Sequence, residues 1–113
     1  MPVSIQFIEN ISETTLPIVK LTKSRNGKTG TATFLFIKPS IFSEFSSQIF
    51  VINGMYLIWE NKKICTKDIE ILFKNGKPFA LKTIFIFKNA IEWFNFLNFM
   101  NLYSKETGLL FAE

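Results

Sequence analysis

The chain contains no histidine and only one cysteine and one arginine. Without imidazole, Ser-His and Cys-His nucleophile systems and histidine-based metal sites are excluded. A lone cysteine, Cys65, excludes an internal disulfide and a Cys-only zinc site, which needs several thiolates. Because Cys65 lies in a run of alternating apolar residues, we predict a core or strand position for it, not a reactive thiol.

Long apolar runs are also missing. The runs at residues 49–52 and 84–87 are far shorter than the roughly 20 residues that a membrane span needs. The first residues read as a strand, with neither a basic leader nor an Arg/Ser-rich presequence. We therefore expect a chain that crosses no bilayer and that works in the compartment where it is made, or that is seen here after processing.

The composition favours one folded domain spanning residues 1–113. Hydrophobic residues make up 48% of the 113 residues and charged residues 19%, which is enough apolar material for a core. Isoleucine, phenylalanine, lysine and asparagine dominate, and their codons are A/T-rich. This bias indicates an A/T-rich genome such as that of an algal plastid.

The first three quarters of the chain show strand-like alternation interrupted by turn residues. We predict strands at residues 3–8, 50–59, 64–74 and 79–88, and a hairpin over residues 18–37. Asn26-Gly27 and Asn75-Gly76 mark hairpin turns, because both residue types tolerate positive φ. Residues 39–45 are predicted to form a connector that contains one helical turn capped by Ser40. The pattern predicts an antiparallel meander.

A helix is predicted to begin at Asn89, a favourable N-cap, with Glu92 reaching back as in a capping box, and to end before Gly108. Its apolar face holds Trp93, Phe96, Leu97, Met100 and Tyr103. Phe94, Phe99 and Leu102 fall on or near the polar side, where either a second layer covers them or they are exposed. Residues 109–111 are read as a tail or short strand. The predicted fold class is α+β: an open antiparallel β-sheet, a meander of hairpins, with a long C-terminal helix packed on one face.

No catalytic constellation is recognisable. Asp68 and Glu70 point to one face of a strand, where a solvated surface is a better reading than a Mg²⁺ site. Gly27 and Gly30 lie in a hairpin without the strand-to-helix context of a phosphate loop. We predict no metal, no cofactor, no small-molecule substrate and no enzymatic activity. A carboxylate-dependent enzyme using Glu70 or Glu92 stays open as a rival.

The strongest polar feature is a basic hairpin. Its cations are Lys20, Lys23, Arg25 and Lys28. Three readings stay open: a solvated tip, a protein-docking surface, or a nucleic-acid surface. In the nucleic-acid reading, bases would stack on aromatic side chains of the strands. These aromatic residues are Phe34, Phe36, Tyr56 and Trp59. Against RNA binding stand the small net charge of +4 and the lack of basic and aromatic interleaving.

The hairpin also carries a resemblance. Residues 21–34, Leu-Thr-Lys-Ser-Arg-Asn-Gly-Lys-Thr-Gly-Thr-Ala-Thr-Phe, followed by Phe36, resemble the signature of a small extrinsic photosystem II family. Its members have been called the photosystem II thirteen-kilodalton protein or reaction-centre W protein. Further blocks agree in order at residues 5–8, 53–58 and 75–78. The closing block comprises Glu92, Trp93, Phe96, Phe99, Met100, Tyr103, Gly108, Leu109 and Phe111.

This resemblance implies a non-catalytic accessory factor in photosystem II biogenesis. Such a protein binds transiently to assembly intermediates on the stromal side of the plastid thylakoid, or the cytoplasmic side of a cyanobacterial one, as a peripheral protein. The implied partners are the larger inner antenna chlorophyll-binding subunit and the nearby reaction-centre subunits, with no nucleic acid. A partner segment is expected to add to the edge of the sheet.

We predict that Lys23, Arg25 and Lys28 dock the partner electrostatically, and that Met55 and Tyr56 make side-chain contacts with it. Asn26 stands where the family usually has Asp, a conservative change because both tolerate positive φ. At five positions of the closing helix where the family tends to carry charged residues, this chain has uncharged ones. They are Phe94, Asn95, Asn98, Asn101 and Leu102.

Overall fold

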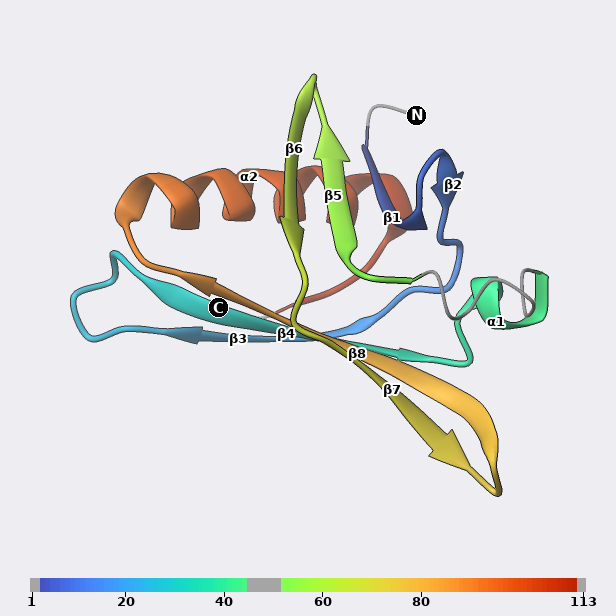
Figure 1. Ribbon diagram of the computed structural model, residues 1–113. Coiled ribbons are helices and arrows are strands. Elements are labelled where there is room, and N and C mark those ends of the chain that lie inside the picture. The colour runs from blue at the N-terminus through green and yellow to red at the C-terminus, as the bar shows by residue number, and fades with distance from the viewer. Residues whose placement is uncertain (1–2, 45–51, 112–113) are drawn as a thin grey trace.

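The computed structural model describes residues 3–44 and 52–111, in which eight strands form two four-stranded antiparallel sheets (Figure 1). The small sheet has the order β2 (Ile11–Ser12), β1 (Val3–Ile8), β5 (Met55–Trp59), β6 (Lys62–Thr66). The large sheet has the order β3 (Ile18–Lys23), β4 (Gly30–Ile37), β8 (Lys77–Phe87), β7 (Ile69–Lys74). The helices are α1 (Ser40–Glu44) and α2 (Ala90–Thr107). The predicted α+β class, with open antiparallel strands and a long C-terminal helix, is confirmed, but the strands form two sheets instead of the single sheet that was predicted.

Several predicted strands coincide with observed ones. Strand β1 covers residues 3–8, and β3 with β4 forms the predicted hairpin over residues 18–37. Strands β7 and β8 meet at Asn75 and Gly76, whose φ angles of 54° and 79° are those of a tight hairpin turn. The strand predicted from residue 50 begins at Met55, and residues 50 and 51 lie outside the described part of the chain.

The prediction of one continuous strand over residues 64–74 is wrong. Strand β6 ends at Thr66 in the small sheet, and β7 begins at Ile69 in the large sheet. The Thr66 hydroxyl accepts a hydrogen bond from the Asp68 amide at 3.1 Å and donates one to the Ile84 carbonyl at 2.6 Å. These bonds turn the chain at residues 67–68 and carry it from one sheet to the other.

Helix α2 has the predicted ends. The Asn89 side chain accepts from the Glu92 amide at 2.9 Å, and Gly108 ends the helix with a left-handed φ of 80°. The Glu92 carboxylate accepts from the Lys88 amide at 3.0 Å, one residue before the expected capping-box partner.

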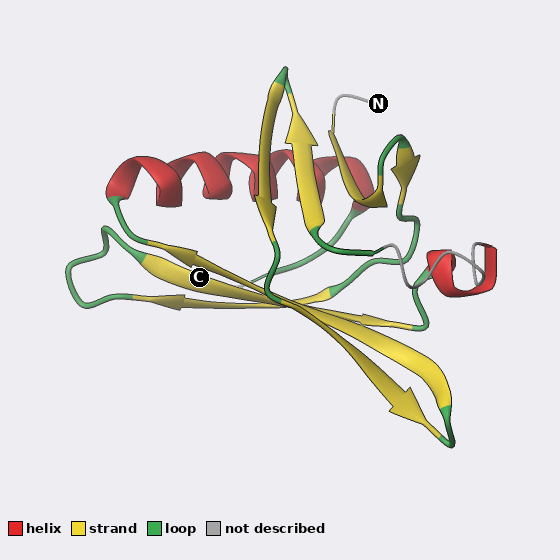
Figure 2. Cartoon of the chain, viewed as in Figure 1, coloured by secondary structure: helices red, strands yellow, loops and turns green. Residues whose placement is uncertain are grey.

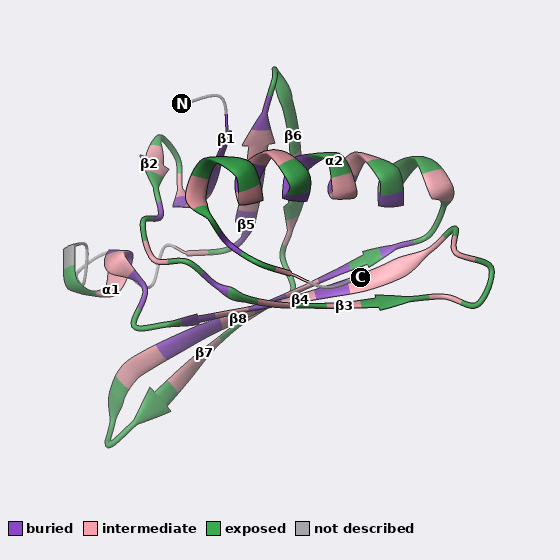
Figure 3. Ribbon diagram, turned by 180° about the vertical axis from the view of Figure 1, so that it is seen from behind, coloured by how far each residue is buried: buried purple, intermediate pink, exposed green. Residues whose placement is uncertain are grey.

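The helix packs against both sheets, and Figure 3 shows buried and exposed residues alternating along it. On the large-sheet side, the ring of Phe96 lies 4.7 Å from that of Phe87, centroid to centroid. On the small-sheet side, the centroids of the Phe99 and Trp59 rings lie 5.4 Å apart. Phe99, which the sequence pattern placed near the polar side, is therefore fully buried because the small sheet supplies a second layer. Phe94 has no such cover and is 59% exposed.

A buried carboxylate anchors α1. Glu13 is 5% exposed and accepts hydrogen bonds from the Ser40 amide and hydroxyl, both at 2.7 Å, and from the Ile41 amide at 3.2 Å. It also accepts from the Thr15 amide at 2.9 Å. The predicted cap at Ser40 is thus replaced by Glu13, which satisfies the first amides of α1 from the β2–β3 connection.

After α2 the chain turns back without forming a strand, and this segment is coloured as a loop in Figure 2. Leu109 is buried in the core, and its carbonyl accepts from the Ser104 hydroxyl. Of the two alternatives for residues 109–111, the tail is observed. Within the described residues, neither helix is long and apolar enough to cross a bilayer.

Candidate partner-binding site

The basic hairpin tip, residues 24–29, is organised by its own polar side chains. The Asn26 side-chain oxygen accepts from the Ser24 hydroxyl at 2.6 Å and from the Lys28 amide at 2.9 Å. Gly27, with φ of 69°, is the tip residue in the left-handed region. Asn26 therefore stabilises the turn through its side-chain hydrogen bonds and does not adopt a positive φ. The turn is a six-residue loop, whereas Asn-Gly predicted a tight turn.

The three predicted docking cations of this tip are exposed. Lys23 ends β3, and Arg25 and Lys28 lie in the loop. The loop projects from one end of the large sheet (Figure 1). A hydrogen-bonded loop that presents cations at the end of a sheet suits long-range attraction to acidic surfaces.

Met55 and Tyr56 point to opposite faces of β5. Met55 has no exposed surface, and its sulfur accepts from the buried Thr83 hydroxyl at 3.4 Å, which joins the small sheet to the large one. The prediction that Met55 contacts a partner is therefore unsupported, because its side chain packs in the core. Tyr56 lies half-buried on the outer face, with the Lys63 ammonium 5.6 Å from the centre of its ring.

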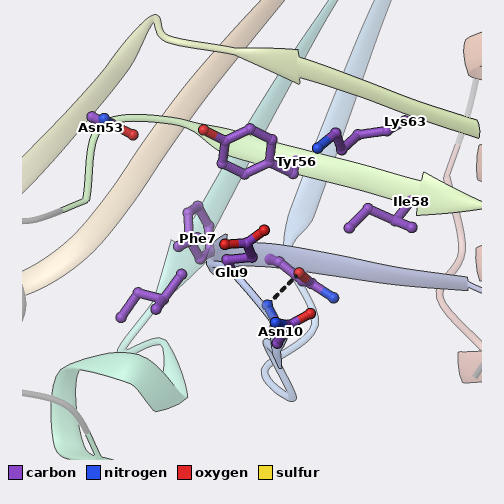
Figure 4. A pocket seen from close by; sticks show the side chains of 9 residues that line it. Phe7, Glu9, Asn10, Asn53, Tyr56, Ile58 and Lys63 are labelled. Atoms are coloured by element: carbon purple, nitrogen blue, oxygen red, sulfur yellow. Dashed lines mark hydrogen bonds between the residues drawn. The ribbon is translucent and has the colours of Figure 1, made fainter.

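Tyr56 also lines a cavity of about 580 Å³ on the outer face of the small sheet, where β1 turns into β2 (Figure 4). The turn is held by a hydrogen bond of 2.9 Å from the Asn10 amide to the Gln6 side chain. The lining mixes amides, one acid, one lysine and apolar groups: Gln6, Phe7, Ile8, Glu9, Asn10, Asn53, Tyr56, Ile58 and Lys63.

A second hollow, of about 300 Å³, separates the edges of the two sheets; we call it the inter-sheet groove. Its wall on one side is β6, on the other the last residues of β8 and the start of α2. It is lined by Ile64, Cys65, Phe85, Ile86, Phe87, Glu92 and Asn95. Cys65 has the predicted strand position, but it is exposed in this groove and does not lie in the core.

The backbone of β8 faces this groove beyond the point where β7 ceases to pair with it. The Ile84 amide donates to the Asp68 carbonyl at 3.1 Å, on the side away from β4. Because strand geometry repeats every two residues, the amide and carbonyl of Ile86 point the same way. The ladder between β7 and β8 ends at Ile69 and Thr83, so Ile86 presents its backbone groups toward the groove.

The groove lies next to two of the predicted docking residues, Lys23 and Tyr56, although neither of them lines it. Ile86 and Phe87 also line a hollow at the base of the basic tip, together with Lys23. On the other wall, Cys65 lies directly opposite Tyr56 in the β5–β6 register. Sequence reasoning missed the groove because it lies between strands of different sheets. The polar residues 66–68, which interrupt the alternation, are the signal that the chain changes sheets there.

The aromatic side chains proposed for base stacking do not form a surface. Phe34 and Phe36 have no exposed area and Trp59 is 1% exposed, since all three face the core. The interpretation of these residues as an RNA-binding platform is therefore wrong. Tyr56 alone of that group is partly accessible.

The carboxylates that the structure describes do not converge on a metal site. Among residues 3–44 and 52–111 no three acidic or thiol side chains cluster in a way that could hold a metal ion. Glu92 serves as a helix cap, and Glu70 is exposed opposite Lys82 on the large sheet. Burial and the nearby Glu13 raise the pKa of Tyr103 to about 12, but this phenol lies in the core and not in a hollow.

Comparison with known proteins decides the family. The model of the Psb28 protein family matches residues 5–111. The chain belongs to the Psb28 family.

Relatives in algae and cyanobacteria carry the name photosystem II reaction center Psb28 protein. The Trieres chinensis protein is 42% identical over 113 residues, which cover 100% of this chain and 98% of the relative. The Guillardia theta protein is 42% identical over 109 residues, 96% of this chain and 94% of the relative. The Nostoc punctiforme protein is 43% identical over 105 residues, which cover 93% of this chain and 91% of the relative. The resemblance seen in the sequence is confirmed, and the Psb28 match includes the basic tip and the inter-sheet groove.

Proposed function

We propose that this chain is a non-catalytic accessory factor of photosystem II biogenesis, which binds transiently to assembly intermediates at the stromal face of a plastid thylakoid or the cytoplasmic face of a cyanobacterial one. The observation that carries the proposal is the full-length match to relatives named for the photosystem II reaction center. The partners proposed are the inner antenna chlorophyll-binding subunit and the reaction-centre subunits.

In this proposal, an extended segment of the partner lies in the inter-sheet groove. Backbone groups of Ile86 bond to the segment, since an unpaired strand edge recruits a further strand. The mixed lining fits alternate side chains of such a segment: Phe85 and Phe87 are apolar, whereas Glu92 and Asn95 offer hydrogen-bond acceptors and donors. Main-chain bonds supply affinity, and the lining supplies selectivity.

The basic tip and Tyr56 flank the groove and serve different purposes. Lys23, Arg25 and Lys28 orient the protein against acidic loops of the partner, an effect that is strong at low salt and weakens as salt rises. Tyr56 adds a side-chain contact beside Cys65. Met55 has no place in the interface because it has no exposed surface.

The test is to tag the protein in its native organism, solubilise the thylakoids gently and separate the complexes. The proposal expects co-migration with partly assembled photosystem II and absence from the mature complex. Recovery free of photosystem II, or salt-sensitive recovery with RNA, would contradict it. A variant with Lys23, Arg25 and Lys28 changed to Gln is expected to associate more weakly at low salt and to depend less on salt, because the orienting attraction is lost while the main-chain bonds remain. The variant with Lys62, Lys67 and Lys105 changed to Gln is the matched control.

A further inference from the structure

The positive charge of the molecule is concentrated on the large sheet. Residues 18–38 and 69–88, which contain its four strands, hold nine of the thirteen Lys and Arg residues and one of the nine acids. Their net charge is therefore +8, and that of the remaining residues is −4. A biased codon usage sets how many lysines the protein contains but not where they lie.

Much of this charge lies away from the basic tip and the groove. Lys20 and Lys82 belong to the face of the large sheet that points away from α2, because their neighbours Val19 and Leu81 point inward. At the opposite end from the basic tip, the β7–β8 hairpin carries Lys74 and Lys77 (Figure 1).

Exposed apolar side chains lie among these cations. Ile18 is 62% exposed and pairs with Leu35 in the row that continues to Lys82. Ile37 is 38% exposed on the same face, and Phe73, at the end of the β7–β8 hairpin, is 59% exposed. Figure 3 shows the tip of this hairpin as exposed. Aliphatic and aromatic groups surrounded by lysines are typical of surfaces that lie at a membrane interface.

We infer that this outer face of the large sheet, defined by Ile18, Lys20, Leu35, Ile37 and Lys82 together with the β7–β8 hairpin tip, docks on an anionic lipid surface. The inference goes beyond the proposed function, which requires only a protein partner. Two features favour lipid over protein here. The cations are spread along the sheet, from Lys20 on β3 through Lys82 to Lys74 and Lys77 at the β7–β8 hairpin, instead of converging on one point. Exposed apolar side chains separate them.

In the bound state the ammonium groups lie at the lipid phosphates, and the exposed Ile18 and Phe73 enter the headgroup region. The single acid of this face, Glu70, lies opposite Lys82, and the four lysines Lys20, Lys74, Lys77 and Lys82 leave the face positively charged. The basic tip and the groove then stay beside the membrane, free to engage a membrane protein.

The test is sedimentation of the purified full chain with vesicles of phosphatidylcholine and phosphatidylglycerol in equal amounts, against phosphatidylcholine alone. The inference expects binding to the anionic vesicles only, released by added salt. The variant with Lys20, Lys77 and Lys82 changed to Gln is expected to bind about a hundredfold more weakly. The matched control changes Lys62, Lys67 and Lys105, exposed cations outside the large sheet, to Gln and is expected to bind within about threefold of the parent.

Equal loss of binding in the two triple variants would overturn the inference, because it would show a response to net charge alone. Binding to an acidic polypeptide but not to the vesicles would also overturn it, in favour of a protein partner. The variants Ile18→Ser and Phe73→Ser, which touch exposed side chains, are expected to weaken vesicle binding without changing thermal unfolding. Because the vesicles contain no protein, the two experiments are independent. The chain can fail to bind vesicles and still co-migrate with photosystem II, or bind vesicles and fail to co-migrate.

Discussion

The two sheets have the same number of strands in the described chain but differ in size and charge. The strands of the small sheet are two to six residues long, and those of the large sheet six to eleven. Positive charge is gathered on the large sheet. The small sheet covers the second side of α2 and completes the core. In this chain, therefore, one sheet completes the core and the other carries most of the positive charge.

The sheets are joined through one continuous core, to which helix α2 contributes. Helix α2 uses Phe96 toward the large sheet and Phe99 toward the small one. The Thr83 hydroxyl bonds to the Met55 sulfur, and Thr66 bonds across to Ile84. Substitutions at these contacts therefore separate the contribution of one sheet to the free energy of unfolding from that of the other.

The largest effect is expected when α2 loses an aromatic ring. Phe96→Ala should lower the free energy of unfolding by about 4 kcal/mol, since it leaves a cavity among large-sheet rings. Phe99→Ala should cost about 3 kcal/mol, because Phe99 has fewer ring partners. Urea unfolding measures both, with the exposed Phe94→Ala as control. A greater loss for Phe99→Ala would show that the small sheet contributes more to the core.

The next effect concerns the carboxylate that ties the small-sheet side to α1. Glu13→Gln should lower the free energy of unfolding by about 2 kcal/mol, because an amide cannot accept all four hydrogen bonds and places an NH₂ group against donors. The exposed Glu9→Gln is the matched control and should change stability by less than about 0.5 kcal/mol. Equal unfolding curves for the two variants would contradict the anchoring role of Glu13.

A smaller effect is expected within the large sheet at Gly30. An added Cβ would lie 2.7 Å from the Trp93 ring and 2.9 Å from the Thr22 carbonyl oxygen, so Gly30→Ala should cost about 1–2 kcal/mol. The cost should fall in a Trp93→Leu background, which a double-mutant cycle of thermal unfolding measures. A coupling energy of zero would mean that the ring does not require this glycine.

The smallest effect appears only at alkaline pH. Burial, then Glu13, raises the pKa of Tyr103 to about 12, so the folded state prefers the neutral phenol. This contribution is complete below the unfolded pKa of about 10 and is lost as pH rises through about 12. Stability measured across that window should fall less steeply in Tyr103→Phe than in the parent. The same slope in both proteins would contradict the prediction.

Local features were predictable from the sequence, whereas pairings distant along the chain were not. The caps of α2 at Asn89 and Gly108 depend on nearby residues, and the structure has both. The burial of Phe99 and the break at residues 67–68 depend on a second sheet that alternation alone does not reveal. The cations predicted for the basic tip are exposed, as the sequence indicates. Met55 and Tyr56 were both predicted to contact a partner, but neighbouring residues of a strand point to opposite faces, and Met55 lies on the buried one.

The position of Cys65 allows a direct test of whether a partner segment occupies the inter-sheet groove. As the one cysteine of the chain, and an exposed one, it can be labelled with a bulky maleimide without changing any other residue. The labelled protein is then offered to partly assembled photosystem II, beside a control labelled at Glu60→Cys in a Cys65→Ser background. If the segment lies in the groove, the label at Cys65 abolishes binding and the label at position 60 leaves it intact. Full binding with the groove blocked would contradict this placement.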